Sequence, residues 1–168
     1  VIGNASQFNL YPRNIVGQIE VDDFISIDFN EVLAQVVEKR YEHITLRIIN
    51  GGQIGQNKAV TVQRSISLPP LTEKDHKAIS IGRKLGVRHY ALSFAGHADE
   101  VNQLRELAGS GSLIISKIES RRGIKNLNEI SSVSDALLID RGDLSREVPI
   151  VRIPAIQKKI IEQAKKSG

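Results

Sequence analysis

From residue 72 onward the chain alternates between helical spacing and short apolar runs, and this alternation limits the possible fold more than any other feature. Apolar residues at helical spacing predict helices over 72–86, 97–108, 124–133 and 153–166. Apolar runs between them predict strands over 87–94, 112–119 and 135–140. Such strands between helices are typical of a parallel sheet covered on both faces. We predict an α/β fold, either a partial (β/α)8-barrel-like sheet or an open doubly wound sheet.

The first part of the chain has a different character. Short β-branched or alternating runs predict five strands, over 15–21, 24–29, 33–40, 44–49 and 59–63. Turn-forming residues, among them Asn50-Gly51-Gly52 and Asn57, separate some of these runs. The change of pattern falls at Leu68-Pro69-Pro70. We therefore predict a small antiparallel β-rich domain over residues 1–67 and the α/β segment over residues 68–168.

The chain length decides between a whole and a partial barrel. A complete eight-unit barrel takes about 250 residues, whereas this chain has 168. A partial barrel leaves strand edges unpaired, and natural proteins pair or cover such edges. We therefore expect self-association, or a partner chain that completes the barrel.

Composition narrows the classes of function. The absence of cysteine excludes disulfides, cysteine-ligated zinc and thiol catalysis. No apolar run approaches the roughly 18 residues of a membrane span, and no secretory leader is visible, so we expect a cytoplasmic protein without membrane association. The net charge of +4 is spread along the chain and aromatic residues make up 4%. This pattern favours a small anionic substrate over nucleic acid.

Charged residues cluster where two predicted strands end. Lys117 and Glu119 are two residues apart, so their side chains point to the same side of a strand. Asp143 follows the next strand, and functional groups of α/β folds gather at these carboxyl ends. Two carboxylates suit Mg²⁺, while a lysine supplies a mobile charge or a proton. The same residues could also be ion pairs at a barrel rim, and the pattern alone leaves both interpretations open.

Several motifs follow one another in order along the α/β segment. They are Leu68-Pro69-Pro70-Leu71-Thr72-Glu73-Lys74-Asp75, Ser93-Phe94, Lys117-Ile118-Glu119-Ser120, Ser134 through Leu144, and Gln157-Lys158. Together they resemble the core of the pyruvate kinase family, over roughly residues 15 to 160. The resemblance implies a pyruvate kinase-like partial barrel beside a small β-domain.

The resemblance also implies a role for each matching residue. It implies phosphoryl transfer between phosphoenolpyruvate and ADP that depends on a divalent metal, Mg²⁺ or Mn²⁺. Lys117 would stabilise the phosphoryl group and the enolate, and Glu119 and Asp143 would bind the metal. Arg141, Gly142 and Asp143 would hold the substrate carboxylate through backbone amides, and Ser93 would contact the substrate.

Some positions depart from the family pattern. Ala95 stands where an arginine is usual, Asp140 replaces an alanine and adds a third carboxylate, and Ser120 and Ser145 replace an asparagine and a glycine. The family's segment for phosphate and K⁺ is not found before residue 15, nor is its later threonine-bearing strand found. These departures weaken the expectation of K⁺ binding, nucleotide binding and full turnover more than that of a metal and oxyacid site. The alternatives are a non-catalytic homologue acting as a binding, regulatory or assembly module, and a metal-enolate lyase or aldolase acting on pyruvate.

Overall fold

The computed structural model of the protein describes residues 3–4, 6–28 and 31–167. It divides into two compact units, Val1–Pro69 and Pro70–Gly168, which are described separately. Within the described residues, no helix combines the length and the apolar character needed to cross a membrane.

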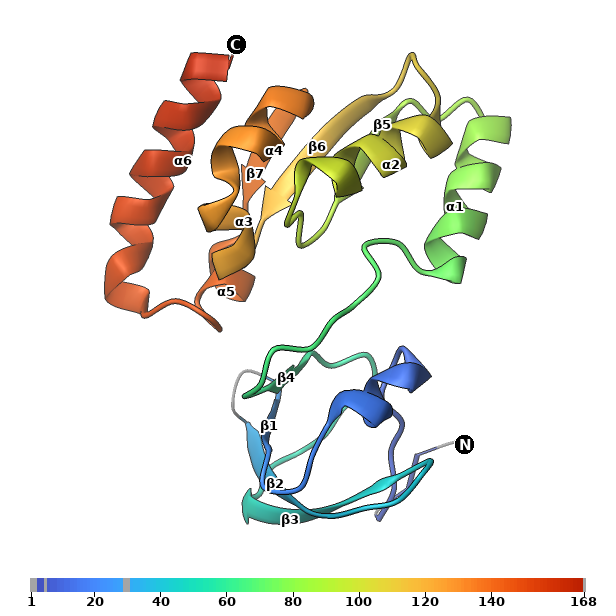
Figure 1. The fold of residues 1–168 in the computed structure, drawn as a ribbon, viewed down its shortest axis with the longest axis vertical. Coiled ribbons are helices and arrows are strands. Elements are labelled where there is room, and N and C mark those ends of the chain that lie inside the picture. Colours follow the sequence, from blue (N-terminus) through green and yellow to red (C-terminus); the bar gives the residue numbers. More distant parts are fainter. Residues whose placement is uncertain (1–2, 5, 29–30, 168) are drawn as a thin grey trace. The chain divides into compact units, whose positions relative to one another are not determined.

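The first unit is built on an antiparallel four-stranded sheet of order β3-β2-β1-β4 (Figure 1). The strands are β1 (Phe24–Ile27), β2 (Val32–Lys39), β3 (Ile44–Asn50) and β4 (Val60–Val62). Alternate residues of β1 and β2 point inward, as their period of two predicts, and form the core with Ile19: Ile25, Ile27, Val32 and Val36. Part of the predicted strand 24–29 lies outside the described residues.

The predicted strand over 15–21 is wrong. The structure has a 3₁₀ helix, η1 (Arg13–Gln18), followed by extended chain. The Ile15 N–H donates to the Pro12 carbonyl at 3.2 Å, and the Ile19 N–H donates to the Val16 carbonyl at 3.3 Å. These local hydrogen bonds replace a strand ladder, so only Ile19 of this apolar run is fully buried.

The second unit is a mixed α/β structure around a parallel sheet of order β5-β6-β7. Its elements are α1 (Glu73–Lys84), β5 (His89–Leu92), α2 (Ala98–Ala108), β6 (Leu113–Ile118), α3 (Arg121–Lys125), α4 (Leu127–Val133), β7 (Ala136–Ile139), α5 (Arg141–Leu144), η2 (Ile150–Arg152) and α6 (Ile153–Ser167). These described strands form an open sheet and not a closed barrel, so the prediction of a partial barrel-like α/β fold is confirmed.

Local sequence signals explain where α1 begins and ends and how β7 is held in place. Thr72 caps α1 in a capping box with Asp75, and Gly86 follows the helix at a φ of +77°. Asp135 sits before β7 and its Oδ2 accepts from the Ile114 N–H at 2.7 Å and from the Arg105 guanidinium at 2.8 Å. The Ile114 N–H and then Arg105 hold the pKa of the Asp135 carboxyl below its usual range. Asp135 therefore ties β7 to β6 and α2.

Helices cover one face of the parallel sheet. Ile114, Ser116 and Ile118 of β6 are buried on that face, in a core that also takes in residues of α1, α2, α4 and α6. On the other face Leu113 is exposed and Ile115 and Lys117 are half-buried. The expected burial of both faces is therefore wrong for the described residues. The uncovered face is the one that carries Lys117.

The helix predicted over 124–133 begins earlier and is divided into α3 and α4. Ser120 caps α3 because its Oγ accepts from the Gly123 N–H at 3.1 Å. The break falls at Asn126, whose side chain donates to the Gly96 carbonyl at 2.7 Å. Glycine is needed at position 123 of α3, because a Cβ there would lie only 2.6 Å from the Ala95 carbonyl oxygen.

Candidate functional site

The register of the parallel sheet brings the predicted site residues to one edge. Ile118 of β6 is paired with Ile139 of β7, so Glu119 and Asp140 leave the sheet at neighbouring positions. Ser93 follows the last residue of β5 on the other side of β6. Side chains far apart in sequence therefore meet at the carboxyl ends of the strands.

Glu119 is the buried centre of this edge, with a side chain that is 0% exposed. Its Oε2 accepts from the Phe94 N–H at 2.7 Å. Its Oε1 lies 2.6 Å from Lys117 Nζ as an ion pair, yet it has no partner in hydrogen-bond geometry. A buried carboxylate normally has its oxygens hydrogen-bonded or bound to a cation. Oε1 is therefore held by the charge of Lys117 without a hydrogen bond in good geometry.

Lys117 supplies the positive charge of the site. Besides Glu119, its Nζ lies 3.5 Å from Ser93 Oγ and 3.7 Å from Asp140 Oδ2. Its pKa is raised, chiefly by the Glu119 carboxylate, although partial burial acts in the opposite direction. The lysine is therefore a cation at neutral pH. It joins the ends of all three strands through Ser93, Glu119 and Asp140.

The short helix α5 carries the other two carboxylates. Asp140 caps α5, because its Oδ1 accepts from the Gly142 N–H at 3.1 Å and from the Asp143 N–H at 3.2 Å. Asp143 Oδ1 pairs with Arg146 at 3.0 Å. Aspartate is a preferred cap because it satisfies N–H groups that the first turn of a helix leaves unpaired. These two N–H groups belong to the segment Arg141 to Asp143, whose backbone amides are expected to hold a substrate carboxylate.

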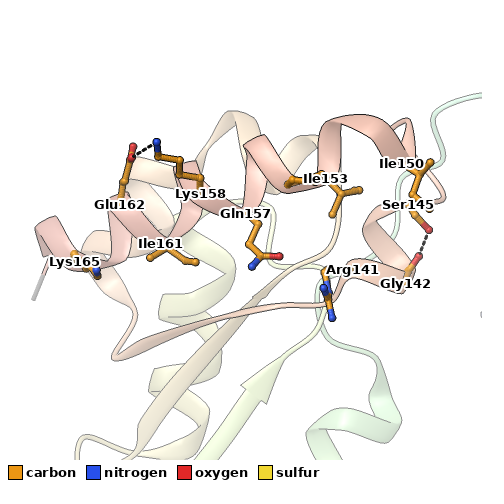
Figure 2. Close-up of a pocket in the computed structure, with 11 residues that line it drawn as sticks. Arg141, Gly142, Ser145, Ile150, Ile153, Gln157, Lys158, Ile161, Glu162 and Lys165 are labelled. Atoms are coloured by element: carbon orange, nitrogen blue, oxygen red, sulfur yellow. Dashed lines mark hydrogen bonds and ion pairs between the residues drawn. The ribbon is translucent and has the colours of Figure 1, made fainter.

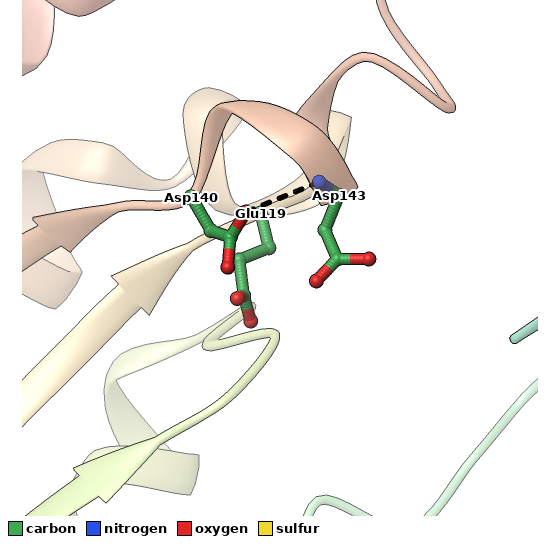
Figure 3. A group of neighbouring side chains, drawn as sticks. All are labelled: Glu119, Asp140 and Asp143. Carbon is green, nitrogen blue, oxygen red and sulfur yellow. Dashed lines mark hydrogen bonds between the residues drawn. The ribbon is translucent and has the colours of Figure 1, made fainter. Parts of the chain in front are cut away.

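Glu119, Asp140 and Asp143 form one acidic group. Each offers a carboxylate oxygen, and these oxygens lie within 4.8 Å of one another (Figure 3). Carboxylate oxygens close together suit a hard divalent cation. Oε1 of Glu119 fits such an ion, because it is buried, makes no hydrogen bond and already lies beside a cation, the Lys117 ammonium.

The side chain of Arg141 points away from the acidic group, although its backbone belongs to the first turn of α5. The side chain is exposed and lines a groove of about 840 Å³ along α6, with Gln157, Ile153 and Ile161 (Figure 2). Gly142 also lines this groove. Among the predicted site residues, Lys117, Glu119, Asp143 and Ser93 converge, whereas the Arg141 side chain faces the groove.

Sequence reasoning missed two contributions. Phe94 binds Glu119 through its backbone and adopts a φ of +53°, which is unusual for a bulky residue and costs of order 1 kcal/mol or more. No sequence signal marks this conformation. The capping role of Asp140 had a signal, because aspartate directly before a helical turn is a preferred N-cap.

Comparison with known proteins decides the family. The family model for the pyruvate kinase barrel domain matches residues 2–168 of this chain. The chain belongs to the pyruvate kinase family. The family resemblance predicted from the ordered motifs is thereby confirmed.

Individual pyruvate kinases align with the whole chain. The enzyme of Sporosarcina psychrophila is 35% identical over 175 residues, that of Staphylococcus aureus strain MRSA252 33% over 174, and that of Clostridium perfringens strain 13 33% over 173. The alignments cover 100% of this chain but only 30%, 30% and 36% of these relatives. The chain therefore spans about a third of the length of the pyruvate kinases it matches.

Proposed function

We propose that this chain holds the metal and oxyacid site of a pyruvate kinase-like phosphotransferase acting on phosphoenolpyruvate and ADP. The observation that carries the proposal is the convergence of Lys117 with three carboxylates around the buried, hydrogen-bond-free Oε1 of Glu119. Phosphoryl transfer depends on positioned cations more than on covalent chemistry by the protein. A lysine beside a divalent-ion site would provide these positioned cations.

In this proposal Glu119 and Asp143 bind the divalent ion, Mg²⁺ or Mn²⁺. The bound ion supplies positive charge that stabilises oxyanions of the substrate. Glu119 is preoriented for this role because the Phe94 N–H fixes its Oε2. Asp143 is held by Arg146 through Oδ1, which leaves its Oδ2 for the ion.

Lys117 is the proposed catalytic residue. Its ammonium is available beside the carboxylates, and it would donate to a phosphoryl or enolate oxygen of the substrate. Ser93 Oγ, 3.5 Å from Lys117 Nζ, would share in binding the same oxyacid. We assign no residue of this chain to ADP or K⁺.

The first turn of α5, formed by Arg141, Gly142 and Asp143, is the proposed seat of the substrate carboxylate. The Gly142 and Asp143 N–H groups already donate to Asp140 Oδ1. A substrate carboxylate must displace Asp140 to use them. This occupied position favours one second candidate, a non-catalytic family member that binds the metal without turnover.

A coupled assay for pyruvate separates the two candidates. The 168-residue chain is supplied with phosphoenolpyruvate, ADP and Mg²⁺, and Lys117→Met is assayed beside a control variant at an exposed residue, Asp99→Asn. The phosphotransferase proposal predicts turnover that Lys117→Met abolishes and that Asp99→Asn retains, because the Asp99 side chain is exposed and, among the described residues, takes no part in the ion pairs of Lys117 and the three carboxylates. Oxalate or Mn²⁺ binding without any turnover would instead support the binding module.

We also propose that the open sheet is completed by a second copy or another chain. β5 and β7 are edge strands of the parallel sheet. Leu138 of β7 is 40% exposed, and Ile161 of α6, a helix that contacts β7, is 41% exposed. Apolar side chains beside an unpaired edge favour association. A light-scattering mass of one chain at micromolar concentration, with no partner added, would contradict self-association.

A cytoplasmic location is part of the same proposal, because phosphoenolpyruvate and ADP are cytoplasmic metabolites. Fractionation of cells that express the chain tests it. Recovery with a cytoplasmic marker is expected, and recovery with a periplasmic or secreted marker would contradict it.

A further inference from the structure

We propose that Asp140 is a third carboxylate ligand of the divalent ion and sets the strength of its binding. This inference rests on the proposed function, since it concerns the same ion. It assigns a role to a residue that stands where the family pattern has an uncharged alanine. The two oxygens of Asp140 have different partners, Oδ1 the backbone of α5 and Oδ2 the Lys117 ammonium.

The first oxygen fixes the side chain. Oδ1 accepts from both the Gly142 and Asp143 N–H groups, and the Asp143 bond is visible in Figure 3. Two hydrogen bonds from one helical turn restrict the rotamer of a short side chain. The position of the second oxygen is therefore set by the backbone of α5.

The second oxygen faces the site. Oδ2 lies 3.7 Å from Lys117 Nζ, which is ionic contact but longer than a hydrogen bond. The Asp140 side chain is 36% exposed, so it is partly accessible to solvent. Asp140 thus presents a fixed anionic oxygen toward the ends of β6 and β7.

An independent observation points to a cation at this place. Glu119 is buried, its Oε1 has no partner in hydrogen-bond geometry, and one of its carboxylate oxygens lies within 4.8 Å of ligand oxygens from Asp140 and Asp143. Among the described residues, two cations make ion pairs with these carboxylates: Lys117 with Glu119 and Asp140, and Arg146 with Asp143. Three carboxylates against two side-chain cations leave one negative charge. A divalent ion would meet that charge, and affinity for such ions rises with the number of charged ligands.

The test is a calorimetric titration of the 168-residue chain with Mn²⁺. Asp140→Asn keeps an oxygen that can cap Gly142 and Asp143 but removes the charge. We expect it to weaken Mn²⁺ binding about tenfold, the lower end of the loss seen when groups around a metal site are removed. Asp140→Ala should bind equally weakly and also lower the thermal midpoint, because the cap is lost. Asp99→Asn is the control and should bind as the unaltered chain does.

Repeating the titration at high salt distinguishes a direct metal ligand from a charge that acts at long range. If Asp140 touches the ion, the tenfold loss persists at 0.5 M salt, whereas a screened long-range effect disappears there. Asp140→Asn binding within twofold of the unaltered chain, while Glu119→Gln loses binding, would overturn this inference and leave the proposed metal site intact. Absence of Mn²⁺ binding by the unaltered chain would overturn the proposed function itself.

Discussion

The ion pair between Lys117 and Glu119 gives the sharpest test of how the site is built. The two charged atoms lie 2.6 Å apart, which corresponds to roughly 6 kcal/mol of attraction at an effective dielectric constant of 20. Burial of the carboxylate offsets much of this energy, since desolvation costs several kcal/mol per ion. Lys117 keeps 22% of its side chain exposed, which reduces its own share of that cost. We expect a net coupling of about 2 kcal/mol.

A double-mutant cycle measures this coupling. Lys117→Met should lower the free energy of unfolding by about 2–3 kcal/mol, because it leaves a buried carboxylate without its cation. Glu119→Gln should cost only about 1 kcal/mol, because the amide oxygen can still accept from the Phe94 N–H. The double variant should be no less stable than Lys117→Met alone, since its buried side chain is uncharged.

Urea unfolding at pH 7, without metal, supplies these free energies. The pKa of Lys117 is raised above the ordinary value of 10.5, so the stabilisation is complete at pH 7 and disappears only as pH rises through the folded-state pKa. A coupling below about 0.5 kcal/mol would refute the reasoning, because independent sites add within that margin. The pair would then be no stronger than an exposed salt bridge.

Three further results are expected. The pKa of Asp135 is lowered by the backbone N–H of Ile114 and by Arg105, so its contribution to stability should be lost as pH falls through that lowered pKa. Asp135→Asn should therefore flatten the acid dependence of stability, measured by urea unfolding between pH 6 and 2. Gly123→Ala should lower stability by about 1–3 kcal/mol, because its Cβ would meet the Ala95 carbonyl at 2.6 Å, and an unchanged thermal midpoint would contradict this. Thr72→Ala should cost about 1 kcal/mol by removing the cap of α1, whereas Thr72→Ser should cost little.

The sequence was sufficient to predict the parallel sheet and the charged pair at its edge. Apolar runs between helical stretches identified β5, β6 and β7. The two-residue period of a strand put Lys117 and Glu119 on one side, and the 2.6 Å contact agrees with it. Both predictions depend on local periodicity, which single-sequence patterns carry directly.

Other features depend on contacts that a sequence pattern does not encode. The run 15–21 has β-branched residues, yet hydrogen bonds over three residues make it the 3₁₀ helix η1. The break between α3 and α4 at Asn126 follows from a bond to Gly96, thirty residues away. The positive φ of Phe94 accompanies its bond to Glu119, in the next strand-end segment. Each of these features is set by tertiary contacts or by local bonding that competes with propensity.

Anomalous diffraction from crystals soaked in Mn²⁺ tests the proposed metal site most directly. Data collected at the manganese absorption edge locate the ion without reference to activity. We expect one strong peak bounded by Glu119 and Asp143, with Asp140 Oδ2 as a third neighbour, and no such peak in Glu119→Gln crystals. A well-ordered Glu119 still paired with Lys117, with no peak beside it at saturating Mn²⁺, would contradict the metal site and favour ion pairs at the rim of the sheet.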